Sequence, residues 1–535
     1  MKSIKKFLAV ILSMTLMLTL GTATFGAQKT LPSGKDTGSI NVTNLKPGDI
    51  VTAYQFVKAD YNEYGFTGYS AINNYVKDPV APTAQEVIDM ASNAATMTVA
   101  AEKKVATGDT EVTINGLPVG YYLVMVTSGS ETVYSPMIAG IYYSKSATDN
   151  TLKNGAISAD SDFEIKAQKC WAKSSTPKLE KTIVTPSSKN SKGDDIAIGD
   201  KITFNLSATV PSYSKEYKKV TYKIYDIMSE GLDYVDGSMK CFIEKYENNR
   251  ENIKVTPKVN GGIIEITFDS KFILEHPGQK IQVEYQAKLN EKAGVNFDAN
   301  INKAYLEYSN NPASGSTAKT GEDKVYVYTF GIDSNLFGKS TEKWNEKTKE
   351  LIKVEEGEYQ WVETEKESGI FTTTTALEGA TFTLINNITK KSYTATSDKY
   401  GYLKFTGLDA GEYTLQETDA PDGFTLNDAK HTVVITAEYN QDGTLKSYTI
   451  KIDDKATSTY TATYDKGVIK TITSTKDSQG NISESAILKN SKMSFLPSTG
   501  GVGTTIFAIV GVVFVAAALG LHMILRGKSK LEQDR

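Results

Sequence analysis

Short segments in which apolar and polar residues alternate recur along most of the chain. Residues 38–44, 111–115 and 201–210 carry Ile, Val, Phe, Leu or Ala at every second position, which is the period at which strand side chains share a face. Turn-forming residues separate these segments, and this regular spacing is typical of β-sandwiches. Residues 84–95 are an exception, for which we predict one helix. The pattern therefore predicts a mostly β protein with several immunoglobulin-like sandwiches in tandem.

Two longer apolar runs lie near the ends of the chain. Residues 7–20 follow a basic start and precede small residues, which predicts a secretory signal peptide over residues 1–27; an uncleaved anchor is the alternative. Cleavage could follow Ala23, Gly26 or Ala27. Residues 502–525 are long enough to cross a hydrocarbon layer of about 30 Å, and a basic tail follows them. We expect an exported protein whose precursor is held transiently in the cell membrane.

Composition narrows the class of protein further. At 535 residues the chain is long enough for about three domains. A net charge of −4 without a dominant basic block argues against a nucleic-acid partner. Cys170 and Cys241 are the two cysteines, and the sequence leaves open whether they are paired or free, so the domains need another means of stabilisation. The three histidines show no metal-ligand spacing and no nucleophile–base grouping, so we expect no metal, no cofactor and no enzyme.

A five-residue motif stands directly before the C-terminal apolar run. A Leu-Pro-x-Thr-Gly motif, an apolar span and a basic tail together resemble the cell-wall sorting signal of Gram-positive surface proteins. Pro497 favours an extended backbone that can lie in an enzyme groove. The resemblance implies that a sortase cleaves after Thr499, joins it to an amine, and finally anchors the protein to peptidoglycan. The motif residues are Leu496, Pro497, Ser498, Thr499 and Gly500.

In the middle of the chain, three polar residues each lie among apolar residues at every second position. Lys181 lies between Leu179 and Ile183 at this spacing. Asp226 stands at the end of a second apolar alternation, and Asn302 stands at the start of a third. A lysine, an aspartate and an asparagine in this order resemble the fimbrial isopeptide-forming domain. The resemblance implies a spontaneous bond between Lys181 and Asn302, with Asp226 as the catalytic acid. The alternative is that each residue is exposed or capped at a strand end.

Residues 411–424 resemble the E-box of CnaB-type sandwiches. On a strand, Tyr413, Leu415 and Glu417 share one face, so the carboxyl group is expected in the core, where it needs a partner. The resemblance implies that Glu417 catalyses a second bond between a lysine and Asn490. Leu336 occupies the usual lysine position, and the nearest candidate is Lys339.

The first region differs, because Met125 stands where the E-box has its glutamate, and we predict no such bond there. At the end of this region, Trp171-Ala172-Lys173 replaces the Tyr-Pro-Lys-like motif of shaft pilins. The resemblance implies that Lys173 is the amine that attacks Thr499 of a neighbouring subunit. Lys169 and Lys178 are the alternatives.

Together these motifs resemble those of sortase-assembled major (backbone) pilins of Gram-positive bacteria. The implied function is a structural shaft subunit of a covalent pilus; the alternative is a monomeric wall-anchored adhesin or a pilus base or tip subunit. The implied partners are further copies of the chain, pilus-specific and housekeeping sortases, minor pilins and peptidoglycan, and a host ligand is left open. The resemblance implies three sandwiches of CnaA or CnaB type. The predicted domains are a signal peptide (1–27), an N-terminal sandwich (28–172), a middle fimbrial isopeptide-forming domain (173–322), a CnaB-type domain (323–494) and the sorting signal (495–535).

Overall fold

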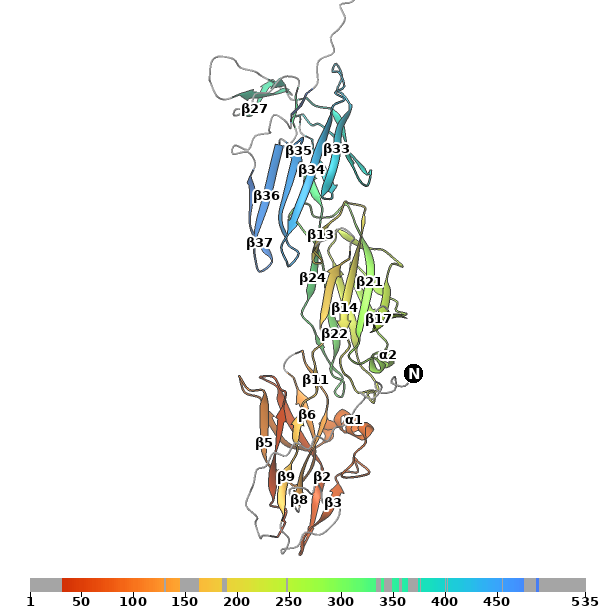
Figure 1. The fold of residues 1–535 in the computed structure, drawn as a ribbon, viewed down its shortest axis with the longest axis vertical. Helices are drawn as coiled ribbons and strands as arrows, with labels where there is room; N and C mark the ends of the chain where they lie inside the picture. Colours follow the sequence, from red (N-terminus) through yellow and green to blue (C-terminus); the bar gives the residue numbers. More distant parts are fainter. Residues whose placement is uncertain are drawn as a thin grey trace, which may run out of the picture.

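Figure 1 shows the strands of this computed structural model in three successive groups along its long axis. Strands far outnumber helices among the described residues, so the predicted fold class is confirmed. The signal peptide, the sorting motif and the expected membrane span lie outside the described residues. The structure describes residues 31–128, 131–144, 163–184, 190–246, 249–332, 338–340, 349–355, 358–363, 374–375, 377–399, 401, 403–454, 456–475 and 487–489.

The first group has a sheet of order β10-β1-β5 and a sheet of order β3-β2-β6-β8-β9, in which β4 also pairs with β2. Both sheets contribute alternate residues to one core, for example Ile40 from β1 and Val51 from β2. The strands are β1 (Thr37–Thr43), β2 (Ile50–Asn62), β3 (Gly65–Ala71), β4 (Val99–Lys104), β5 (Glu111–Pro118), β6 (Gly120–Thr127), β7 (Val133–Tyr134), β8 (Met137–Ser144), β9 (Glu164–Ala167), β10 (Lys169–Trp171) and β11 (Ser174–Ser175).

The predicted helix is present as α1 (Ala84–Ser92), and a 3-10 turn, η1 (Ala94–Thr96), follows it. α1 begins with a capping box, in which the side chains of Thr83 and Glu86 satisfy each other's backbone N–H groups. Val87, Ile88, Met90 and Ala91 are its buried residues. In the described parts of the chain, no helix has the length and apolar character that a membrane span requires.

The middle group is a two-sheet sandwich. One sheet has the order β12-β14-β21-β17-β18 with β16 beside β21, and the other has the order β13-β24-β22-β15-β20-β19 with β23 beside β22. Burial alternates strictly along β14, as the sequence predicts for residues 201–210. The elements are β12 (Leu179–Ile183), β13 (Gly193–Asp195), β14 (Lys201–Thr209), β15 (Tyr222–Met228), β16 (Leu232–Tyr234), β17 (Lys240–Tyr246), β18 (Asn249–Ile253), β19 (Lys258–Asn260), β20 (Ile263–Thr267), α2 (Ser270–Glu275), β21 (Lys280–Leu289), β22 (Asn300–Asn311), β23 (Ser316–Lys319) and β24 (Asp323–Tyr328).

The third group is built on a sheet of order β31-β30-β33-β34-β35-β36-β37. Smaller pairings are β25-β32, β26-β38 and β27-β28-β29. The strands are β25 (Phe330–Ile332), β26 (Gly338–Ser340), β27 (Lys349–Glu355), β28 (Glu358–Glu363), β29 (Thr374–Thr375), β30 (Thr381–Asn386), β31 (Ser392–Thr396), β32 (Phe405–Leu408), β33 (Gly411–Asp419), β34 (Lys430–Tyr439), β35 (Leu445–Ile452), β36 (Ala456–Asp465), β37 (Val468–Thr475) and β38 (Ile487–Lys489).

The passage from the middle group to the third differs from the boundary expected between residues 322 and 323. β24 starts at Asp323 but pairs with β22 and β13 of the middle sandwich, so it belongs to that sheet. One residue, Thr329, separates β24 from β25, which pairs with β32 of the third group. The two groups are therefore joined by nearly continuous strand rather than by a polar linker.

Candidate functional site

The middle sandwich brings together the three polar residues that the sequence singles out. Lys181 lies on β12 in one sheet, whereas Asp226 on β15 and Asn302 on β22 lie in the facing sheet. Each of the three side chains is 0% exposed. The apolar alternation around each residue therefore predicts its inward direction correctly, and the alternative of exposed or capped positions does not apply.

The three side chains meet through Tyr285 on β21. Lys181 Nζ forms a buried ion pair with Asp226 Oδ2 and also donates to the Tyr285 hydroxyl at 3.2 Å. The Tyr285 hydroxyl donates to Asp226 Oδ1 at 2.8 Å and accepts from Asn302 Nδ2 at 2.7 Å. One hydroxyl thus touches the amine, the carboxylate and the amide.

Burial determines the charge states of this cluster. Desolvation lowers the pKa of Lys181, although the attraction of Asp226 opposes this shift. Desolvation also raises the pKa of Tyr285 well above its ordinary value, so its hydroxyl keeps its proton. Lys181 can therefore give a proton to Asp226 and become a neutral amine, which is the form that attacks a carbonyl carbon. Asn302 Oδ1 is buried without a hydrogen-bond partner among the described residues, which leaves the amide poorly compensated.

Tyr285 is the member of the cluster that sequence reasoning missed. A signal is present, because Ile281, Val283, Tyr285 and Ala287 alternate on β21 and all face the core. A tyrosine in such a row carries a hydroxyl that needs a partner when it is buried. The sequence alone does not reveal that this partner is the lysine–aspartate pair on other strands.

In the third group, the E-box strand is oriented as predicted. Tyr413, Leu415 and Glu417 on β33 are at most 2% exposed, and Asn427 N donates to Glu417 Oε2 at 2.8 Å. β26 pairs in parallel with β38, with the backbone of Lys339 opposite Leu488. Asn490 follows β38 and lies outside the described residues. The backbone pairing brings the expected lysine close to the end of the strand that leads to the expected asparagine.

In the first group, β6 carries the corresponding row of residues without the acid. Tyr121 and Leu123 are buried, and Met125 is half-buried at the position of the glutamate. A thioether cannot supply the proton transfers that a carboxyl group supplies. The expectation of no self-made bond at this position stays a prediction.

Lys173 lies between β10 and β11, at the passage from the first group to the middle group. Its backbone is held on both sides, because Ser135 N donates to Lys173 O at 3.0 Å and Ala172 N donates to Thr43 O at 3.0 Å. Its side chain is exposed, as are those of the alternatives Lys169 and Lys178. The neighbouring Trp171 is 68% exposed. The expected acceptor, residues 496–500, lies outside the described residues.

The two cysteines are free thiols, which settles the alternative that the sequence leaves open. Cys170 lies in the first core and Cys241 in the middle core, and burial raises the pKa of each thiol to about 12. Such thiols stay protonated and unreactive at neutral pH. A disulfide therefore does not contribute to the stability of either core.

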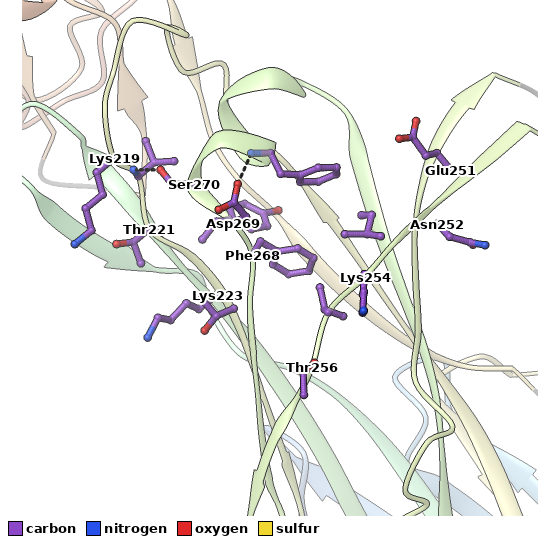
Figure 2. Close-up of a pocket in the computed structure, with 16 residues that line it drawn as sticks. Lys219, Thr221, Lys223, Glu251, Asn252, Lys254, Thr256, Phe268, Asp269 and Ser270 are labelled. Atoms are coloured by element: carbon purple, nitrogen blue, oxygen red, sulfur yellow. Dashed lines mark hydrogen bonds between the residues drawn. The ribbon is translucent and has the colours of Figure 1, made fainter.

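A groove of about 710 Å³ opens beside the start of β15, at the end of the strand away from Asp226 (Figure 2). Phe268 lies within it, while Lys219, Lys223 and Lys254 stand at its margin. Asp269 caps α2 there by accepting from Phe272 N at 2.9 Å, so its carboxylate stabilises the start of this helix. Among the described residues, no group of His, Cys, Asp and Glu side chains could hold a metal ion.

Comparison with known protein families gives three matches along the chain. A T6 antigen Ig-like domain matches residues 35–174, and a SpaA-type prealbumin-like fold domain matches residues 370–449. An LPXTG cell-wall anchor motif matches residues 489–530. The last match includes the expected sorting motif and places the mature protein at the cell wall, outside the cell.

Similar whole proteins extend these local matches. The trypsin-resistant surface T6 protein of Streptococcus pyogenes serotype M6 is 26% identical over 549 residues, which span 93% of this chain and 96% of that protein. The solved structure of the T6 backbone pilin from the same serotype, a modular three-domain protein, has a TM-score of 0.57 at 20% identity. The similarity covers 86% of this chain and 100% of that one, and it shows the same fold.

Proposed function

We propose that this chain, a cell-wall-anchored surface protein of the sortase-assembled backbone-pilin type, builds the shaft of its pilus through a bond between Lys173 and Thr499 of the neighbouring subunit. Bonds between Lys181 and Asn302, and between Lys339 and Asn490, stabilise the middle and third domains from within. Asp226 and Glu417 catalyse these two internal bonds. The chain is a structural subunit and a sortase substrate, and its self-made bonds form once per molecule.

The observation that carries the linkage is the setting of Lys173. A polymer, unlike an anchored monomer, needs an amine on the subunit itself that an enzyme-bound thioester can reach. Lys173 offers an exposed amine on a backbone that hydrogen bonds fix to the first domain. A fixed backbone lowers the entropy that is lost when the reacting atoms are brought together. Lys178 is also exposed, and its carbonyl accepts from Thr209 N at 3.3 Å, so a fixed backbone is common to both lysines. The proposal favours Lys173 because it stands where the Tyr-Pro-Lys-like motif of shaft pilins has its lysine.

The internal bond of the middle domain is supported by the contacts of the cluster. Lys181 and Asn302 come from opposite sheets, and both lie within hydrogen-bond distance of the same Tyr285 hydroxyl. A covalent link here would join the two sheets across their core. It would replace a buried ion pair, which by itself is weak evidence for stability.

The linkage is tested by replacing the amine in cells that carry the assembly sortase. Lys173→Ala and Lys173→Arg both remove the nucleophile, and the arginine keeps the charge. We expect boiled, enzymatically released wall extracts to give a high-mass ladder for the unmodified chain and a monomer band for both variants. Lys178→Ala is the matched control, because it removes another exposed lysine of the same junction, and its ladder should persist.

Three other results would contradict the assignment. A monomer band from the unmodified chain would overturn the shaft function and leave an anchored adhesin or a base or tip subunit. A ladder that survives in both Lys173 variants, but is lost in Lys169→Ala or Lys178→Ala, would move the linkage to that lysine. A ladder that survives in all of them would place the acceptor amine elsewhere.

A further inference from the structure

The acid of the middle cluster does not touch the amide on which it is proposed to act. Asp226 Oδ2 contacts Lys181 Nζ, and Asp226 Oδ1 accepts from the Tyr285 hydroxyl. Asn302 Nδ2 donates to that same hydroxyl. Among the described residues, the path from the carboxyl group to the amide therefore runs through Tyr285.

Bond formation needs a proton at the atom that Tyr285 touches. When Lys181 Nζ bonds to Asn302 Cγ, the Cγ–Nδ2 bond has to break, and an unprotonated amide nitrogen is a very poor leaving group. General acids act on atoms within hydrogen-bond reach, which means about 2.6–3.2 Å. The Tyr285 oxygen lies 2.7 Å from Nδ2, within that range.

We propose that Tyr285 is a catalytic residue of the middle domain, and that it relays a proton from Asp226 to the departing nitrogen of Asn302. This inference rests on the proposed bond between Lys181 and Asn302. It adds a fourth participant to the expected lysine, aspartate and asparagine.

The proton balance follows from the contacts. Lys181 Nζ first gives a proton to Asp226 Oδ2 and attacks Asn302 Cγ, forming a tetrahedral intermediate. The carboxyl group of Asp226 then turns about its Cβ–Cγ bond, which brings the protonated oxygen to the Tyr285 hydroxyl. Tyr285 gives its hydroxyl proton to Nδ2 and takes the Asp226 proton in the same step, so the Cγ–Nδ2 bond breaks and ammonia leaves. The remaining extra proton on Nζ passes to Asp226. The products are one amide bond, one ammonia, an intact tyrosine and a protonated carboxyl group.

The surroundings of Tyr285 suit a relay better than a free acid. Its raised pKa disfavours a tyrosinate, so the hydroxyl has to gain a proton as it gives one. The side chain is fully buried, and its ring packs against Phe204 at 5.5 Å between centroids. The hydroxyl is thus held in place before the reaction, and water is kept from competing with it.

The test follows bond formation in the full chain as it is synthesised in vitro. Aliquots are quenched in denaturant and digested, and the cross-linked peptide that has lost one ammonia is quantified by mass spectrometry over time. Tyr285→Phe keeps the ring and removes the relay. We expect its bond to form at least about tenfold more slowly than in the unmodified chain, within the range typical of general acid catalysis.

Tyr222→Phe is the matched control. Tyr222 is also a buried tyrosine of this sandwich, at 1% exposure, and its hydroxyl has no hydrogen-bond partner among the described residues. Removing that hydroxyl should leave the rate of bond formation unchanged. If Tyr222→Phe slows the bond as much as Tyr285→Phe does, the effect is one of packing and the relay is wrong.

The two levels of the proposal fail in different ways. Absence of the cross-linked peptide from the unmodified chain would overturn the bond itself. A bond that is lost in Asp226→Ala but forms at the normal rate in Tyr285→Phe would keep the bond and its acid and overturn the relay. A slow bond in Tyr285→Phe, together with normal rates in Tyr222→Phe, supports the relay.

Discussion

At the scale of single residues, Asp195 at the end of β13 shows how the middle and third domains are held together. Its Oδ1 accepts from Ala410 N and its Oδ2 accepts from the Tyr439 hydroxyl, both at 2.5 Å and both from the third domain. Desolvation raises its pKa to about 6, and the nearby Asp194 and Asp409 add to the shift. Ionising Asp195 in the folded joint therefore costs more free energy than ionising it in the unfolded chain.

The raised pKa predicts a pH dependence with a definite sign. Below the unfolded pKa of about 4, Asp195 is protonated in both states and the joint has its full stability. As the pH rises through about 6, the folded carboxyl group ionises and stability is lost. We expect this loss to be on the order of 1–2 kcal/mol, because the side chain keeps some access to water. Urea unfolding of the full chain at several pH values measures it.

Asp195→Asn is the control for this pH dependence. The amide can accept from Ala410 N and donate to the Tyr439 hydroxyl, but it does not titrate in this range. The difference in unfolding free energy between the variant and the unmodified chain should therefore grow between pH 4 and pH 7. A constant difference across that window would show that Asp195 is not the titrating group.

Residues also show where sequence reasoning succeeds and where it stops. The inward directions of Lys181 and Glu417 follow from local alternation, which depends only on strand geometry. The partners of Tyr285 and Asp195 depend on strands that are distant in sequence, and in the second case on another domain. A period-two pattern shows which face a side chain occupies, but it does not show which side chain lies opposite.

At the scale of elements, most strands were predictable and one boundary was not. The expected boundary after residue 322 rests on the polar composition of residues 309–321, yet these residues form the end of β22 and the hairpin to β23, whose residues are largely exposed. An exposed hairpin at a sheet edge has the composition of a linker, so composition alone does not separate the two. The pairing of β24 with β22 joins residues that are separated in sequence, and it places β24 in the middle sandwich rather than in the third domain.

The joint between the middle and third domains depends on a close backbone approach between β13 and the turn before β35. Gly443 has a φ of +89°, and a Cβ built there would lie 2.2 Å from Lys192 O. Asn190 Nδ2 also donates to Asn440 O at 2.7 Å, which ties the same turn to the middle domain. The approach leaves no room for a side chain.

We expect Gly443→Ala to destabilise this joint by at least about 2 kcal/mol, because it combines an unfavourable positive φ with a backbone clash. Gly423→Ala is the matched control, since its φ of +83° is similar but a Cβ there meets nothing within 4 Å. Urea unfolding compares the two variants, and small-angle scattering reports the angle between the domains. Equal destabilisation by both would show that the close approach contributes nothing.

At the scale of the whole molecule, the proposed bonds define which parts of the chain carry tension. Load that enters at Lys173 reaches Lys181 within eight residues of sequence and crosses to Asn302 through the internal bond. It then follows β22 and β24 and enters the third domain through β25. The first domain lies outside this path, which accounts for a core that has Met125 in place of a catalytic acid.

Single-molecule pulling of the polymer tests this path. When load is applied through the subunit linkages, we expect no unfolding step from the first or the middle domain. Asn302→Ala should add one step from the middle domain, because residues 182–301 are then no longer bypassed by a covalent bond. Asn302→Ala also removes the hydrogen bond from Asn302 Nδ2 to the Tyr285 hydroxyl, so circular dichroism first checks that the middle domain of the variant is folded. Pulling a monomer from its N-terminus should instead unfold the first domain, whose strands are held by non-covalent stability of only about 5–15 kcal/mol. Identical traces for the unmodified polymer and Asn302→Ala would mean that the middle domain carries load without the bond.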